Sequence, residues 1–197
     1  MSPTVAPANN GTRAACPTVS PSLIASSGLE LPAFELKFLL NEAQSLEVVE
    51  RIAGRLIFDP YGDPSRGHAY DTTSLYCDTA QLDVFHRLGL GKRRKHRLRR
   101  YGASPWVFLE RKIKWGDRVK KRRTLIADTD LSLLIHPLCD GDWTGEWFHR
   151  HLQRRQLSPV CTIAYERVAL IGQSAEGPMR LTFDRNIRGG YDDLLAG

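Results

Sequence analysis

Two stretches decide the fold: Arg93-Arg94-Lys95-His96-Arg97-Leu98-Arg99-Arg100-Tyr101 and Trp106-Val107-Phe108-Leu109-Glu110-Arg111-Lys112-Ile113-Lys114. Both have the pattern of β-strands, in which successive side chains alternate between two faces. One face of the first stretch then carries four basic residues, and one face of the second carries an acid and two lysines. These sets are Arg93, Lys95, Arg97 and Arg99, and Glu110, Lys112 and Lys114.

The basic charge is local. The window from Arg87 to Arg123 holds sixteen Lys or Arg residues and two acids, whereas the whole chain has a net charge of only +6. Two like charges about 4 Å apart repel by about 4 kcal/mol at an effective dielectric constant near 20. We therefore expect a strongly anionic, polyphosphorylated ligand against this face, since Arg and Lys both bind phosphate oxygens. The alternatives are a solvated charged face, or a nucleic-acid site with Tyr101, Trp106 and Trp115 as stacking platforms.

The composition is typical of one globular domain. The chain has 197 residues, of which 42% are hydrophobic and 25% charged, enough for a substantial core. Residues 1–31 are rich in Pro, Ser, Thr and Ala and are expected to form a flexible leader, with the domain over residues 32–197. No apolar run is long enough to span a membrane, and no secretory signal is present. The four cysteines show no C-x-x-C spacing, which favours free thiols in the cytoplasm.

The order of expected elements favours an α+β fold with an antiparallel sheet. Strands are expected over 34–40, 73–77, 93–101, 106–114, 119–126, 159–171 and 179–187. Helices are expected from Asn41 to the Asp59-Pro60 stop, after Asp78, and within 131–157. Several strands have one charged face and one apolar face. An antiparallel β-barrel or tunnel with a polar, basic lumen and helices packed outside would explain that pattern.

Glu35 and Glu110 are candidate metal ligands. Each carboxylate lies two positions before a lysine on the same expected face, Lys37 or Lys112. A carboxylate weakens the binding of an anion when no metal ion is present. Mg²⁺ or Mn²⁺, in contrast, is bound by a few carboxylates plus substrate phosphates. The alternative is a cross-strand ion pair worth less than about 1 kcal/mol.

Other chemistry-bearing groups give weaker signals. Arg167 and Arg180 lie in well-patterned strands, where an exposed sheet face explains them; beside an anion tunnel they would be further clamps. No Walker loop, nucleophile elbow or dinucleotide fingerprint is present. A zinc interpretation fits no standard ligand spacing; its candidate ligands are His136, Cys139, Asp140, Asp142, His149 and His151.

Seven motifs in sequence resemble those of the VTC catalytic domain, the polyphosphate polymerase branch of the CYTH-like triphosphate tunnel metalloenzymes. They span roughly residues 33–187 and are Phe34-Glu35-Leu36-Lys37, Thr73-Ser74-Leu75-Tyr76-Cys77-Asp78-Thr79, Arg97-Leu98-Arg99-Arg100-Tyr101-Gly102, Phe108-Leu109-Glu110-Arg111-Lys112, Val119-Lys120-Lys121-Arg122, Tyr165-Glu166-Arg167 and Arg180-Leu181-Thr182-Phe183-Asp184. Each motif alone is weak, but their order is fairly specific.

The resemblance implies an antiparallel β-tunnel lined with Lys and Arg. It implies that a nucleoside triphosphate and Mn²⁺ or Mg²⁺ occupy the tunnel and that the terminal phosphoryl group passes to a growing inorganic polyphosphate chain. The phosphate-binding positions that it implies are Lys37, Arg97, Arg99, Lys112, Lys120, Arg167 and Arg180. We take Arg97, Arg99, Lys112, Arg167 and Arg180 as the catalytic candidates. Further candidates for substrate binding are Lys95, Lys114 and Arg122.

The chain departs from the family pattern at its end. The resemblance implies a further strand with a Leu-Glu-x-Lys motif, which supplies a metal-binding Glu and more lysines, and the sequence up to Gly197 does not contain it. We therefore expect a tunnel that lacks one wall. The alternatives to a polymerase are a triphosphatase, in which water replaces the phosphate acceptor, and a non-catalytic polyphosphate- or RNA-binding module. A nucleic-acid partner is not expected, and a membrane-bound partner and the oligomeric state stay open.

Overall fold

The computed structural model describes residues 28–29, 33–136 and 143–190. Its strands are β1 (Gly28–Leu29), β2 (Ala33–Phe34), β3 (Ile57–Phe58), β4 (Ala69–Asp78), β5 (Arg94–Tyr101), β6 (Trp106–Trp115), β7 (Arg118–Ala127), β8 (Ser158–Ser174) and β9 (Gly177–Gly190). Its helical elements are α2 (Glu42–Ile52), α3 (Asp83–His86) and α4 (Glu146–Arg155), with the 3₁₀ helices η1 (Pro64–Arg66), η2 (Gly89–Arg93) and η3 (Asp128–Leu134).

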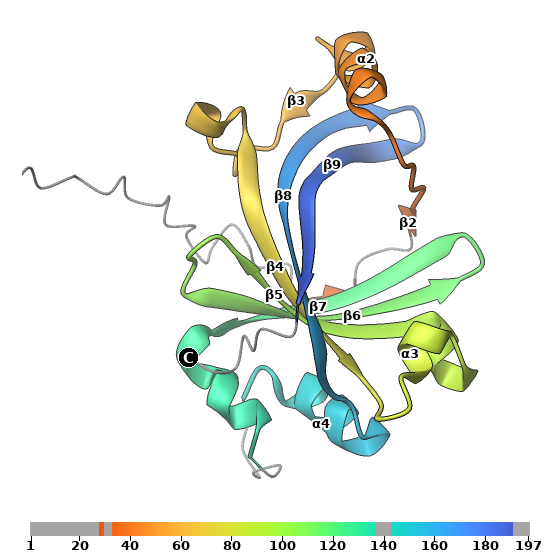
Figure 1. Ribbon diagram of the computed structural model, residues 1–197, viewed down its shortest axis with the longest axis vertical. Helices are drawn as coiled ribbons and strands as arrows, with labels where there is room; N and C mark the ends of the chain where they lie inside the picture. Colours follow the sequence, from red (N-terminus) through yellow and green to blue (C-terminus); the bar gives the residue numbers. More distant parts are fainter. Residues whose placement is uncertain (1–27, 30–32, 137–142, 191–197) are drawn as a thin grey trace, which may run out of the picture.

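All nine strands belong to one antiparallel sheet. The order is β1-β7-β6-β5-β4-β8-β3, with β2 also on β7 and β9 also on β8. Figure 1 shows β8 and β9 curving away from the β6–β7 hairpin, so that the sheet curls into a half-barrel. Within the described residues, β7 and β9 do not pair with each other. The segment that carries β2 and α2 runs between the tips of these two hairpins. This architecture confirms the expected α+β fold with an antiparallel, curled sheet.

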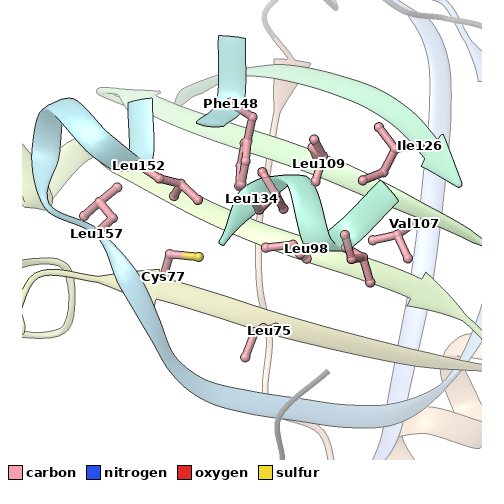
Figure 2. Close-up of a cluster of buried hydrophobic side chains, with 11 residues drawn as sticks. Leu75, Cys77, Leu98, Val107, Leu109, Ile126, Leu134, Phe148, Leu152 and Leu157 are labelled. Carbon is pink, nitrogen blue, oxygen red and sulfur yellow. The ribbon is translucent and has the colours of Figure 1, made fainter. Parts of the chain in front are cut away.

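The hydrophobic core lies between the sheet and the helices α4 and η3. Phe148 and Leu152 of α4 point at Leu98 and Leu109 of the sheet (Figure 2). Phe148 and Leu109 have no exposed surface, and burying a side chain of this size contributes about 1.5–3 kcal/mol. The whole cluster comprises Leu75, Cys77, Leu98, Val107, Leu109, Ile126, Leu131, Leu134, Phe148, Leu152 and Leu157. The helices therefore cover the outer face of the sheet, as the sequence predicted.

The first expected strand is much shorter than predicted. Only Ala33 and Phe34 pair with β7, and residues 35–40 have no regular structure. Leu36, Phe38 and Leu39 are exposed. Apolar alternation alone does not make a strand, because each strand needs a neighbour to receive its backbone hydrogen bonds. Here two residue pairs join the chain to β7, and β7 itself begins at Arg118, so the ladder ends at Phe34.

Three predicted helix boundaries can be compared with the structure. Asn41 caps α2 in a capping box with Gln44, as expected. The helix ends at Ile52 and does not reach Asp59-Pro60, because Gly54 adopts a left-handed backbone with φ +74° and Ile57–Phe58 pairs with β8. The N-cap position of α3 is Leu82 and not Asp78, but the Asp78 carboxylate accepts hydrogen bonds from the backbone N–H groups of Val84 and Phe85 in the first turn, and from that of Thr79. Asp78 therefore caps α3 from outside the helix.

Parts of three predictions lie outside the described residues. Gly28–Leu29, within the predicted leader, pairs with β7, and residues 1–27 and 30–31 are not described. Cys77 and Cys161 are free thiols, whereas Cys16 and Cys139 fall outside. Of the zinc candidates, Cys139, Asp140 and Asp142 also fall outside, and the described residues contain no cluster of three metal-ligating side chains. No helix within the described ranges is long and apolar enough to cross a membrane.

Candidate active site on the concave face

Strand register divides the side chains of the sheet into two sets. The row Cys77, His96, Arg111 and Arg122 faces the core and α4, whereas the row Tyr76, Arg97, Glu110 and Arg123 faces the other way. Side chains of the second face reach across intervening strands: Arg99 of β5 contacts Tyr165 of β8 past β4, and Arg180 of β9 contacts Tyr70 of β4 past β8. We call this second face the concave face.

Arg99 is a buried cation without a carboxylate partner. Its side chain is 5% exposed. Its Nε donates to the Ser74 hydroxyl at 3.0 Å and its Nη2 donates to the Tyr165 hydroxyl at 3.0 Å. Within the described residues it forms no ion pair, although a charge taken out of water is normally paired. Arg99 is therefore held in place by neutral groups and keeps its charge available to an anion.

Arg97 lies beside Arg99 on the same strand face and is paired. Its guanidinium contacts Glu110 at 2.5 Å, and its Nη1 donates to the Tyr76 hydroxyl at 3.1 Å. Burial alone would lower the pKa of Arg97, but Glu110 and Tyr76 outweigh it and raise that pKa. Burial would likewise raise the pKa of Glu110, but Arg97 and Arg99 hold it below its usual range. Both groups therefore stay ionised.

Lys112 lies two residues after Glu110 on the same face of β6. It pairs with Glu35 from the segment after β2. Burial lowers the pKa of Lys112, and the nearby ammonium groups of Lys37 and Lys121 lower it further. Glu35 raises it, but not enough to cancel these effects. Burial would raise the pKa of Glu35, but Lys112, Lys37 and Lys121 bring it below its usual value. One carboxylate thus lies among three ammonium groups, which leaves a net positive charge.

The two site candidates on the β8–β9 hairpin, Arg167 and Arg180, are both paired. Arg167 donates to both oxygens of Asp184, at 2.6 and 2.7 Å. Burial would lower the pKa of Arg167, but the hydrogen bonds to Asp184 raise it. Arg180 pairs with the buried Asp59 and donates to the Tyr70 hydroxyl at 3.1 Å. These two ion pairs extend the charged face over β8 and β9. Each arginine would have to separate from its carboxylate to bind phosphate.

The structure brings most of the predicted site residues to one face. Lys95 and Lys112 are directly opposite each other on β5 and β6, and Lys114 follows on the same face of β6. Lys120 and Arg122 alternate with Lys121 and lie on the opposite, core-side face of β7. The Arg122 guanidinium is 4.1 Å from the ring centroid of Trp147 on α4. The structure therefore does not place Lys120 and Arg122 with the other candidates.

Sequence reasoning missed several residues of the concave face. Lys121 is directly opposite Lys112, and Arg123 is directly opposite Glu110. Gly116 and Asp117 form a two-residue turn between Trp115 and Arg118, and a hairpin of that length fixes the register. Counting residues along both strands from that turn would have placed Lys121 and Arg123 on the concave face. The neutral anchors Ser74 and Tyr165 gave no comparable signal.

The model of one protein family matches most of the chain. It is the model of the VTC domain, and it matches residues 33–192. The chain belongs to the VTC domain family. Curated proteins gave no significant sequence match.

Two solved structures that resemble the VTC chain share little sequence with it. A putative adenylyl cyclase from Hippeastrum, reported to have a dominant triphosphatase activity, is 13% identical, with a TM-score of 0.43 over 75% of this chain and 70% of that one. A putative adenylate cyclase from Bacillus halodurans is 14% identical, with a TM-score of 0.49 over 81% and 82%.

The carboxylates of the concave face suit a metal that arrives with its ligand. Glu35 and Glu110 both point into the cationic face, and each contacts one cation directly. Mg²⁺ and Mn²⁺ need no all-protein cage, since one or two carboxylates and phosphate oxygens can complete their coordination. The donor set is therefore chemically compatible with such an ion, which would compete with Lys112 and Arg97 for the two carboxylates.

Proposed function

We propose that this VTC domain is a polyphosphate polymerase that transfers the terminal phosphoryl group of a nucleoside triphosphate to an inorganic polyphosphate chain on the concave face. The observation that carries the proposal is Arg99, a buried guanidinium with neutral partners. A buried cation of this kind is stabilised when an anion binds beside it. The chain's membership of the VTC domain family supports the same activity.

The residues of this face have distinct tasks in the proposal. Arg99 and Arg97 bind the transferred phosphoryl group and neutralise the charge that spreads over its oxygens in the transition state. Ser74 and Tyr165 hold Arg99 in one orientation, so little reorganisation is needed at the moment of reaction. Lys112 contributes a third charge from the neighbouring strand.

The remaining cations bind the two ends of the substrate. Lys37, Lys95, Lys114 and Lys121 are exposed around Lys112 and can contact phosphates as mobile point charges. Arg167 and Arg180 continue the charge over β8 and β9, where a polyphosphate chain longer than a triphosphate would extend. A series of cations across several strands suits a linear polyanion better than a single phosphate.

A divalent ion, Mn²⁺ or Mg²⁺, is part of the proposal. Glu35 and Glu110 are the residues that would hold it, and it would neutralise phosphate charge beside the arginines. When Glu35 leaves Lys112 for such an ion, the Lys112 ammonium becomes free to bind phosphate. The ion pair seen here therefore keeps both groups in position for substrate.

The test is product analysis with ATP and Mn²⁺. We expect polyphosphate chains on a gel, formed in step with ADP and with little free phosphate. Arg99→Met should abolish the chains, whereas Arg154→Met, at an exposed position on α4, should leave them unchanged. Free phosphate as the main product would replace the polymerase by a triphosphatase. Tight binding of tripolyphosphate without turnover, even with Mn²⁺, would reduce the domain to a binding module.

A further inference from the structure

A second group of arginines lies on the opposite face of the sheet. It comprises Arg94 of β5, Arg111 of β6, Arg122 of β7 and Arg155 of α4, and we call it the outer arginine cluster. Arg111 and Arg122 are directly opposite each other, a placement in which like charges destabilise a sheet. All four side chains are partly exposed, so a ligand from solution can reach them.

Helix α4 provides one wall of the outer arginine cluster. Trp147, His151 and Arg155 are spaced four residues apart and therefore share one side of the helix. The Arg111 and Arg122 guanidiniums lie 5.6 and 4.1 Å from the Trp147 ring centroid. Cation–π contacts of this kind contribute about 0.5–2 kcal/mol each, but they leave the positive charges in place.

No carboxylate pairs with the four arginines among the described residues. Arg111 contacts His151 Nε2 at 2.5 Å, and His151 Nδ1 lies 2.6 Å from the Trp147 carbonyl oxygen. The carbonyl can only accept, so Nδ1 carries the proton and Nε2 accepts from Arg111. His151 is therefore neutral and adds no negative charge. Burial lowers the pKa of Arg111, and Arg122, Arg94 and Arg155 lower it further.

Buried polar atoms beside these arginines have no hydrogen-bond partner in the described structure. Arg111 Nε and both ring nitrogens of His96 are buried and unbonded. His96 has no exposed surface, is directly opposite Arg111 on the neighbouring strand and lies 5.8 Å from the His151 ring. Buried polar groups without partners are rare in folded proteins, so the layer beneath the four arginines is polar as well as the cluster itself.

We propose that the outer arginine cluster is a second phosphate-binding site, separate from the concave face, for a small anion that carries two or more phosphates. One guanidinium group can bind two oxygens of a phosphate. Several arginines together can therefore bind an anion with several phosphates, which a single arginine cannot do. The Trp147 ring is already occupied by two guanidiniums, and its Nε1 donates to Thr124 at 2.8 Å. The ring is thus engaged within the protein, and the recognition in this proposal rests on the phosphates of the ligand and not on a base.

A neighbouring cavity does not serve as this site. It has a volume of about 310 Å³ and is lined by Arg155 on one side, but also by Asp83. A carboxylate in the lining repels an anion. We therefore place the ligand on the sheet side of Arg155, among the other three arginines.

The test uses Arg99→Met protein, in which binding to the concave face is weakened, and tripolyphosphate as the probe at physiological salt. We expect saturable 1:1 binding by calorimetry. Adding Arg155→Ala should weaken it by about tenfold or more, because one charge-assisted contact is lost. Arg154→Ala is the matched control, since Arg154 is exposed on the next position of the same helix and should leave the affinity unchanged.

Two results would overturn the proposal. One is the absence of saturable binding in the Arg99→Met protein, and the other is equal affinity in the Arg155→Ala and Arg154→Ala variants. Arg94→Gln gives an independent check if Arg155→Ala unfolds α4. Because the site does not depend on catalysis, a chain that makes no polyphosphate but still shows this Arg155-dependent binding would refute the proposed polymerase and leave the second site standing.

Discussion

Arg99 and Tyr165 meet across a strand that separates them. The Nη2 of Arg99 on β5 donates to the Tyr165 hydroxyl on β8 at 3.0 Å, with β4 between the two strands. The contact lets a buried guanidinium stay in place without a carboxylate. Burial raises the pKa of Tyr165 despite the nearby charges of Arg99 and Arg167, so the hydroxyl remains a neutral partner.

Arg99→Met separates stability from binding. The substitution removes two hydrogen bonds worth about 1 kcal/mol each, but it also removes an unpaired buried charge. We expect the free energy of unfolding to stay within about 1 kcal/mol of wild type, while the affinity for tripolyphosphate falls at least about tenfold. Urea unfolding and calorimetry measure the two quantities. A large loss of stability with unchanged affinity would show that Arg99 is a structural residue.

Arg97 should behave in the opposite way for stability. Arg97→Met leaves the Glu110 carboxylate, which is only 9% exposed, without its closest partner, and breaking such a pair costs about 3–5 kcal/mol. The double variant Arg97→Met/Glu110→Gln should recover part of that loss in a double-mutant cycle. Arg97→Ala should also weaken triphosphate binding by at least about 1.5 kcal/mol. Additive unfolding energies in the cycle would contradict the pairing.

Lys121 and Lys120 test the two faces of β7. Lys121 is directly opposite Lys112, whereas Lys120 points to the other face. We expect Lys121→Ala to lower the affinity for tripolyphosphate on the concave face several-fold and to reduce its salt dependence, since one ammonium group is lost. Both variants are made in the Arg155→Ala background, which lacks the outer site, and Lys120→Ala is then the matched control. Equal effects from both variants would mean that the face of the side chain does not matter.

Glu35→Gln tests the metal ligand. If Glu35 holds Mn²⁺, the substitution should raise the Mn²⁺ concentration for half-maximal polyphosphate synthesis by about tenfold, as one charged ligand is lost. If Glu35 only pairs with Lys112, the Mn²⁺ requirement should not move, and metal-free tripolyphosphate should bind more tightly. Glu50→Gln, an exposed position on α2, is the control.

His96 should make the stability depend on pH. Burial, with smaller effects from His151, Arg111, Arg155 and Arg94, lowers the pKa of His96 to about 3, from about 6.5 in an unfolded chain. Below pH 6.5 the unfolded state binds a proton at His96 that the folded state does not bind. The free energy of unfolding therefore falls as the pH drops toward 3.

The slope from this one group approaches about 1.4 kcal/mol per pH unit between the two pKa values. His96→Leu should flatten the curve over that window relative to wild type in urea unfolding. Other groups also titrate there, but they titrate in both proteins and cancel in the difference. Parallel wild-type and variant curves would show that His96 takes up its proton in the folded state.

Much of the site could be predicted from local pattern. The alternation in residues 94–101 and 106–114 predicted which side chains share a face, and β5 and β6 have that arrangement. Arg93, which was predicted to be part of the first of these two strands, belongs to η2. The alternation failed at two further places for physical reasons. For Lys120 and Arg122 the face depends on the length of the turn at Gly116 and Asp117, and the prediction did not take that length into account. For residues 35–40 the pattern was strand-like, but after Phe34 no described strand pairs with them.

The sequence by itself determined which side chains of β5 and β6 share a face, because the period of two along a strand is a property of the backbone. Only the tertiary structure decided which cations are neutralised. Arg97, Arg167 and Arg180 each meet a carboxylate, whereas Arg99 meets a tyrosine 66 positions away. Those partners depend on how far the sheet curls, and the curl is set by packing over the whole domain rather than by any local run of residues.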